Sequence, residues 1–153
     1  MKLVYVLSLF VVLSTACSVE PEPIHYGEDN CVHCQMTIMD HRYGTEIVTD
    51  KGKVYKFDSI ECLVEYLQDR KDGEEKYNLV LFTPFDQPGK LVDAGASHVL
   101  HSRKLPSPMG MYLSALETES TARQFQGQYG GKLYDWEALN SNFKILRVNG
   151  PSE

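Results

Sequence analysis

Residues 42–67 of the chain read RYGTEIVTDKGKVYKFDSIECLVEYL, and they predict two strands followed by a helix. The segments 42–49 and 53–57 are rich in β-branched and aromatic residues, and Asp50-Lys51-Gly52 between them is typical of a tight turn. After the second strand, Asp58 and Glu61 have the spacing of a capping box, which predicts Asp58 as the residue that caps the helix. Apolar residues then recur on one helical face, at Ile60, Leu63, Val64 and Leu67.

A buried strand at 77–83 completes a ββαβ unit, and the second half of the chain repeats this order. The pattern there predicts strands at 96–102, 109–116 and 132–134 and a helix at 118–128 that stops at Gly130-Gly131. A last helix at 135–140 and a strand at 143–148 would close the chain. We therefore predict an α+β fold made of two consecutive ββαβ units, about 31–85 and 90–135. The units should pack into one compact body, because neither has much core alone.

Composition supports one small domain and argues against nucleic acids as partners. The chain has 153 residues, of which 42% are hydrophobic, and its formal net charge is −6. Its 15 Lys and Arg residues are scattered along the sequence. Nucleic-acid binding is not expected, because phosphate neutralisation needs a concentrated positive surface.

The first residues have the character of an export signal. After Lys2, the run from Leu3 to Leu13 is apolar apart from Ser8. It is too short to span a bilayer but suits residues 1–16 as a signal peptide. The stretch Leu13-Ser14-Thr15-Ala16-Cys17 resembles a bacterial lipobox, in which Cys17 would carry the lipid. Residues 17–30, acidic and rich in proline at their start, would then form a flexible tether. A buried N-terminal helix with an ordinary cysteine is the alternative.

If residues 1–17 are a lipoprotein signal, the mature protein lies outside the cytoplasm, anchored to a lipid bilayer and facing a periplasm. Ser18 after the lipid cysteine favours the outer membrane of a cell with two membranes. Three cysteines remain there, Cys31, Cys34 and Cys62. An odd number of cysteines in an oxidising compartment means that at least one thiol is free or bound to something. A disulfide between Cys31 and Cys34 is left open.

The densest group of metal-binding residue types lies between Cys31 and His41, with His33 and Met39 among its members. Cys34 and Met36 are two residues apart, so in an extended segment both sulfurs would point to one side, about 6.6 Å apart along the chain. A thiolate combined with a neutral thioether favours Cu(I), whereas zinc prefers thiolates and imidazoles.

A second sulfur-rich stretch is Pro106-Ser107-Pro108-Met109-Gly110-Met111. We predict a Cu(I) site of Cys34, Met36 and Met109, with secondary candidates Cys31, His33 and Cys62. Cys62 lies off the apolar stripe of its helix, and a buried inert thiol is the favoured interpretation of it. For Met39 and Met111 the favoured interpretation is an ordinary core residue. We find no haem attachment motif, second Cys-x-x-Cys pair, zinc-protease motif or phosphate-binding loop, and we expect no enzymatic turnover.

The chain resembles the NosL family of extracytoplasmic copper-binding lipoproteins, which are linked to assembly of nitrous oxide reductase. The resemblance runs through the proposed domain at 31–148 and rests on matching parts in the expected order: Cys17, Cys31-x-x-Cys34-x-Met36, Tyr43-Gly44, Phe57 to Leu63, Asp93-Ala94, Pro108-Met109-Gly110 and Gly130-Gly131. It implies a two-unit ββαβ fold, Cu(I) bound by sulfur, and copper delivery to the copper-sulfide centre of the reductase. It also implies a membrane transporter complex as a partner.

Carried over by position, Cys34 and Met36 match the Cys-x-Met of the family, and Met109 matches the methionine of its Pro-Met-Gly element. The chain departs from the family at Gln35, where glycine is usual; glycine would permit unusual backbone angles there. Two other functions remain open. One is a thiol–disulfide redox protein that uses Cys31 and Cys34. The other is a structural zinc site of Cys31, Cys34, Cys62 and either His33 or His41.

Overall fold

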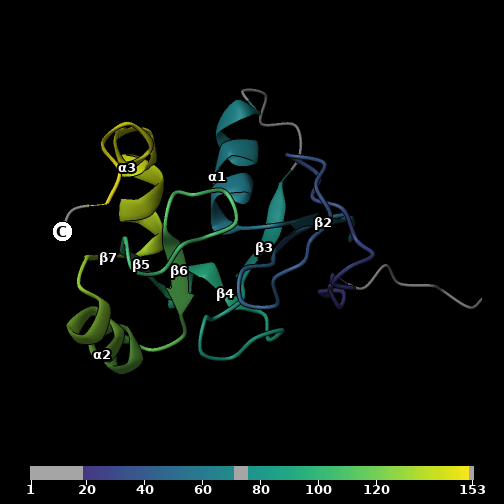
Figure 1. Ribbon diagram of the computed structural model, residues 1–153. Coiled ribbons are helices and arrows are strands. Elements are labelled where there is room, and N and C mark those ends of the chain that lie inside the picture. Colours follow the sequence, from purple (N-terminus) through teal and green to yellow (C-terminus); the bar gives the residue numbers. More distant parts are fainter. Residues whose placement is uncertain (1–18, 71–75, 152–153) are drawn as a thin grey trace, which may run out of the picture.

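The computed structural model describes residues 19–70 and 76–151 and contains two small antiparallel sheets and three helices (Figure 1). The proposed signal peptide and Cys17 lie outside the described residues. In the part of the chain that is described, no helix is both long enough and apolar enough to cross a membrane.

The first sheet has the strand order β2-β1-β3-β4. Its elements are β1 (Thr45–Thr49), β2 (Val54–Phe57), β3 (Tyr77–Phe82) and β4 (Val92–Asp93), with α1 (Ile60–Asp69) between β2 and β3. The second sheet has the order β6-β5-β7. It consists of β5 (His98–His101), β6 (Leu113–Leu116) and β7 (Lys132–Tyr134), with α2 (Glu119–Tyr129) between β6 and β7. Both ββαβ units are therefore confirmed, and β4 adds a short edge strand to the first.

The two units share one core. Phe57 and Leu63 of the first unit belong to the same buried cluster as Val99 and Leu113 of the second. An isolated parallel bridge between Pro84 and Ala115 links the segment that follows β3 to β6. Because this cluster contains residues of both units, the two sheets form one body.

The C-terminal prediction of a strand at 143–148 is wrong. A single helix, α3 (Trp136–Asn149), runs from the cap Asp135 to Gly150, whose φ is +64°. Isoleucine and valine at 145 and 148 gave the segment a strand-like composition. The residues that are buried, however, are Leu139, Phe143 and Leu146, which are spaced four and three apart on one helical face.

Two smaller predictions also need correction. The cap of α1 is Ser59, whose side chain accepts a hydrogen bond from the Cys62 amide, and not Asp58. Part of the expected flexible tether at 17–30 is attached to the first sheet. Lys56 Nζ donates to the Pro23 carbonyl and to Asp29 Oδ2, each at 2.8 Å.

A buried carboxylate lies beneath this N-terminal segment. Glu46 on β1 is fully buried, and its Oε1 accepts a hydrogen bond from the Glu22 amide at 3.0 Å. Burial is the main reason why the pKa of Glu46 rises to about 7. This docking holds the chain from Glu22 onward against the sheet.

Candidate metal centre

A tight turn carries the Cys-x-x-Cys pair, as the spacing of Cys31 and Cys34 suggests. The segment from Cys34 to Met36, however, is not extended as we supposed, because Gln35 between them has a positive φ. Asn30 and Thr37 form an isolated bridge, and between them the Cys31 amide donates to the Met36 carbonyl at 2.8 Å. The Gln35 amide donates back to the Cys31 carbonyl at 3.0 Å. The turn therefore folds Cys34 and Met36 back over Cys31.

Gln35 closes this turn with a φ of +63°, in the left-handed region that disfavours side chains. We expect Gln35→Gly to be more stable than Gln35→Ala by about 1 kcal/mol, because alanine keeps the Cβ clash that glycine removes. Both variants lose the exposed hydrogen bond from Gln35 Nε2 to the Val32 carbonyl, so their difference isolates the backbone effect. Urea unfolding of both variants measures it, and equal stabilities would contradict it.

Three thiols meet where this turn contacts the first turn of α1. The Val32 amide donates to the Lys56 carbonyl at the end of β2, and β2 leads directly into α1. The Sγ atoms of Cys31, Cys34 and Cys62 lie within 4.8 Å of one another. Cys31 and Cys62 are fully buried, whereas Cys34 is half-buried, and none of the three forms a disulfide. We call this group the three-cysteine cluster.

The cluster is electrostatically asymmetric. A hydrogen bond from Cys62 is the largest cause that lowers the pKa of Cys31, to about 5. The same bond raises the pKa of the Cys62 thiol, and burial raises that of Cys34. The hydrogen bonds within the cluster therefore favour the thiolate at Cys31 over a thiolate at Cys34 or Cys62.

The spacing of the sulfurs suits a thiophilic metal ion. An ion about 2.3 Å from each of three sulfurs, the distance typical of zinc thiolates, holds them roughly 4 Å apart. Sulfurs already within 4.8 Å of one another need to move little to reach that arrangement. Cys62, which the sequence favoured as an inert thiol, is buried as expected but belongs to the cluster.

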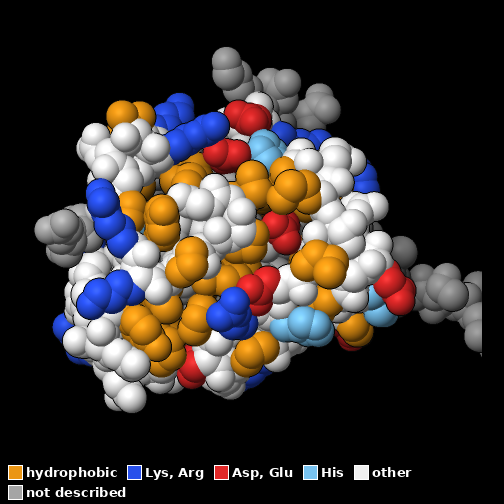
Figure 2. All heavy atoms as spheres, viewed as in Figure 1, with side chains coloured by type: hydrophobic (Ala, Val, Ile, Leu, Met, Phe, Trp, Pro, Cys, Tyr) orange, Lys and Arg blue, Asp and Glu red, His pale blue; other side chains and the backbone are white. Residues whose placement is uncertain are grey.

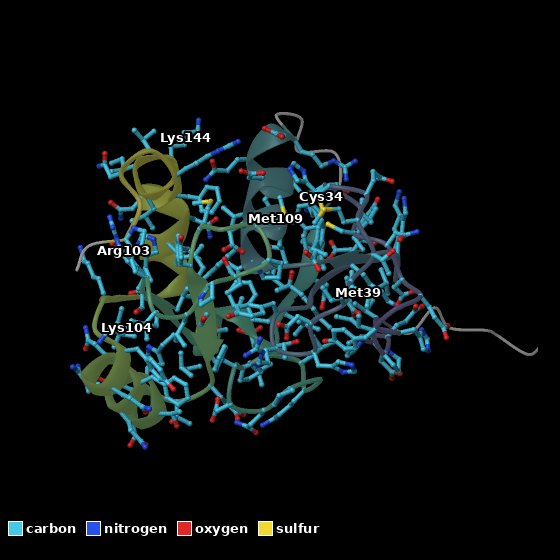
Figure 3. The ribbon with its side chains drawn as sticks, viewed as in Figure 1. Cys34, Met39, Arg103, Lys104, Met109 and Lys144 are labelled. Carbon is cyan, nitrogen blue, oxygen red and sulfur yellow. The ribbon has the colours of Figure 1, made fainter. Side chains whose placement is uncertain are left out.

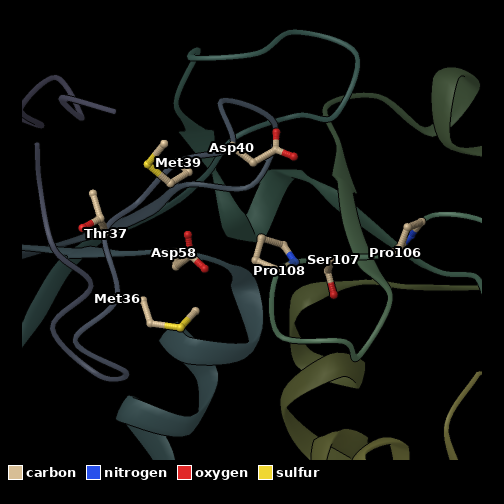
Figure 4. A pocket seen from close by; sticks show the side chains of 8 residues that line it. All are labelled: Met36, Thr37, Met39, Asp40, Asp58, Pro106, Ser107 and Pro108. Atoms are coloured by element: carbon tan, nitrogen blue, oxygen red, sulfur yellow. The ribbon is translucent and has the colours of Figure 1, made fainter. Parts of the chain in front are cut away.

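A pocket of about 340 Å³ is lined by Met36 and Asp58, which are close in sequence to Cys34 and Cys62 (Figure 4). One wall is formed by the segment from Met36 to Asp40, and the opposite wall by Pro106, Ser107 and Pro108. In Figure 4, Met36 lies beside the start of α1, the helix that carries Cys62. The two sulfur-rich stretches of the sequence are thus brought to one site.

The methionines at this site are exposed to different degrees. Met36 is 48% exposed, Met109 37% and Met39 65%, so the core interpretation of Met39 is wrong. Met111, by contrast, packs against the core as expected. Met109, labelled in Figure 3, lies on the loop between β5 and β6, and apolar side chains gather over the centre of this face in Figure 2.

Asp58 also lines the pocket. It is 3% exposed, and burial, followed by the nearby charge of Cys31, raises its pKa to about 6. A carboxylate beside a thiolate and thioethers adds negative potential where a cation would enter.

The two histidines considered as ligands have other contacts. His33 Nε2 lies 2.9 Å from Glu65 Oε2, and Arg147 pairs with the other oxygen of the same carboxylate. His41 stacks on Tyr26 with ring centroids 3.9 Å apart. Among the described residues, the group that could hold a metal contains the three cysteines and no histidine.

Comparisons with known proteins show the family and the fold of the chain. The NosL family model matches residues 23–143. The chain is also similar to the crystal structure of the copper chaperone NosL from Shewanella denitrificans, with 21% sequence identity and a TM-score of 0.66. That alignment covers 78% of this chain and 95% of the other. A comparison with proteins of curated function found no match.

Proposed function

Since the chain belongs to the NosL family, we propose that it binds Cu(I) as cargo and delivers the ion to a copper enzyme. The observation that carries the proposal is the three-cysteine cluster, whose sulfurs lie within 4.8 Å of one another beside the exposed thioether of Met36. The proposed ligands are Cys34 and Met36, together with the buried thiols of Cys31 and Cys62. Met109, the further proposed ligand, directly follows Pro108 of the opposite pocket wall.

The donor set supports Cu(I) over Zn(II). Thiolates and thioethers are soft ligands that select monovalent copper, and zinc rarely uses methionine. Cys31 is the thiol of the cluster that loses its proton most readily, so it offers a negatively charged soft donor to the ion. A zinc site would need a fourth donor, and His33 and His41 have other contacts.

The position of the site supports transfer rather than permanent storage. Cys31 and Cys62 are buried, but Cys34 is half-buried and Met36 faces the pocket. A ligand from a partner protein can therefore reach the open side of the ion while the buried thiols still hold it. Such stepwise ligand exchange needs no catalytic turnover.

We further propose that delivery takes place outside the cytoplasm. The lipobox-like sequence before Cys17 supports a lipid anchor on a periplasm-facing membrane. The resemblance of the sequence to the NosL family supports the copper-sulfide centre of nitrous oxide reductase as the client and a membrane transporter complex as a partner.

Competition for Cu(I) tests the proposal directly. We expect Cys34→Ala and Met36→Leu each to release Cu(I) to a competing chelator at least about tenfold more readily than the unmodified protein, because each removes a sulfur donor. Met111→Leu is the matched control, since it exchanges a core methionine for a residue of similar volume. Anaerobic titration with a chromogenic Cu(I) chelator measures retention. Unchanged retention in both variants would overturn the proposal, and tighter binding of Zn(II) than Cu(I) would favour the structural zinc site.

One observation favours the redox alternative, namely the lowered pKa of Cys31 beside Cys34. Against it, Cys31 is fully buried, so an external disulfide cannot reach its sulfur without opening the turn. Reduction of insulin disulfides that depends on both cysteines would support this alternative instead.

A further inference from the structure

Glu61 is buried beneath the second sulfur-rich stretch, and the proposed ligand set does not use it. The side chain is 1% exposed and lies in the first turn of α1, two residues after the Ser59 cap and one residue before Cys62. Its Oε1 accepts a hydrogen bond from the Ser107 hydroxyl and another from the Leu113 amide, the latter at 3.4 Å. Its Oε2 has no hydrogen-bond partner among the described residues.

These contacts hold a loop whose tip is Met109. Ser107 accepts a hydrogen bond from the Tyr112 amide at 2.8 Å through the same hydroxyl that it donates to Glu61. The Gly110 amide closes the loop on the Ser107 carbonyl at 3.0 Å. At the start of the loop, the Tyr43 hydroxyl donates a hydrogen bond to the Pro106 carbonyl at 2.9 Å.

The loop has a conformation that needs such support. Tyr112 has a φ of +62°, which is costly for a residue with a side chain and persists only where neighbouring contacts hold it. A carboxyl buried this fully is itself costly unless it is hydrogen-bonded. A leucine at position 61 would fill the space but could not hold Ser107 and Leu113.

We propose that Glu61 is a positioning residue, which holds the Met109 loop against α1 and so places the Met109 thioether relative to the three-cysteine cluster. Glu61 does not touch the ion; it acts through Ser107. The inference rests on the proposed function, since it takes Met109 to be a Cu(I) ligand.

A double-mutant cycle tests this coupling. We expect Glu61→Leu to weaken Cu(I) retention about tenfold, the range seen when a partner behind a metal ligand is lost. Met109→Leu should have a similar effect. The two changes together should cost no more than either alone, because both act through one ligand. Additive losses would overturn the inference.

NMR of the methionine methyl groups distinguishes a positioning role of Glu61 from a purely structural one. It measures whether Cu(I) shifts the signal of each methionine. In the purified protein, Cu(I) should shift the ¹³C-labelled methyl signals of both Met36 and Met109. In Glu61→Leu it should shift only that of Met36. Glu61→Gln should restore the Met109 shift, because its amide oxygen can accept both hydrogen bonds. Glu46→Leu is the matched control: it removes an equally buried carboxylate that does not contact the loop, and both shifts should persist.

The outcomes separate the two proposals. If Met109 does not shift in the unmodified protein, Met109 is not a ligand, and the inference fails with that part of the proposed function. If it shifts there and also in Glu61→Leu, only the inference fails. Should Glu61→Leu fail to fold, Ser107→Ala removes the same link from the loop side. It should lose the Met109 shift, and a retained shift would overturn the inference.

Discussion

Cys62→Ser is expected to release Cu(I) more than about a hundredfold more readily than the unmodified protein, beyond the usual loss for a partner behind a ligand. Serine has nearly the same size but replaces a soft sulfur by a hard oxygen that Cu(I) avoids. Cys62 is fully buried and its sulfur lies within 4.8 Å of those of Cys31 and Cys34. The same anaerobic chelator competition measures the effect.

The control for this variant is its stability without copper. Thermal unfolding of the metal-free protein shows whether serine disturbs the first turn of α1 in its own right. Weaker retention with little change in melting temperature would place Cys62 among the ligands. Unchanged retention in Cys62→Ser, together with a loss in Cys34→Ala, would reduce the site to the Cys-x-Met pair and Met109.

Phe143→Ala is expected to lower the free energy of unfolding by about 3–5 kcal/mol, the usual cost of removing a buried phenyl ring. Phe143 is 1% exposed on α3 and belongs to the core that both ββαβ units share. Urea denaturation monitored by circular dichroism measures the change.

Ile145→Ala is the matched control, and it also distinguishes helix from strand. In a strand, residues 143 and 145 would face the same side, and both substitutions would be costly. On α3, Ile145 is 57% exposed, so its loss should change stability by less than about 0.5 kcal/mol. A large effect at Ile145 would contradict the helix.

Local patterns predicted most of the fold. The alternation around Asp50-Lys51-Gly52 placed β1 and β2 within a few residues, because a hairpin and its turn are encoded side by side. The helical spacing after Ile60 placed α1 equally well. The C-terminal strand failed because composition outweighed spacing: Ile145 and Val148 suggested a strand, although the residues that meet the core follow a helical period.

The candidate site could be predicted only in part. Residue types indicated a sulfur site, and a pocket joins the segments of Met36 and Pro108 as the sequence suggested. Two features depend on tertiary contacts that no local pattern carries. Cys62 joins the cluster because the hydrogen bond from Val32 to Lys56 sets the turn against the start of α1. The glycine that the family usually has at position 35 was one hint of the tight turn, because glycine tolerates the positive φ that Gln35 adopts.

The docked N-terminal segment has a geometric consequence. The backbone is held to the first sheet from Glu22 onward, by the contacts of Glu22 and Pro23 with Glu46 and Lys56. If Cys17 carries a lipid, the linker between the bilayer surface and the folded domain consists only of residues 17 to 22. Fully stretched, it reaches about 18 Å. With so short a linker, the folded domain would stay within roughly its own radius of the membrane. A client protein would then have to bind it at the membrane surface.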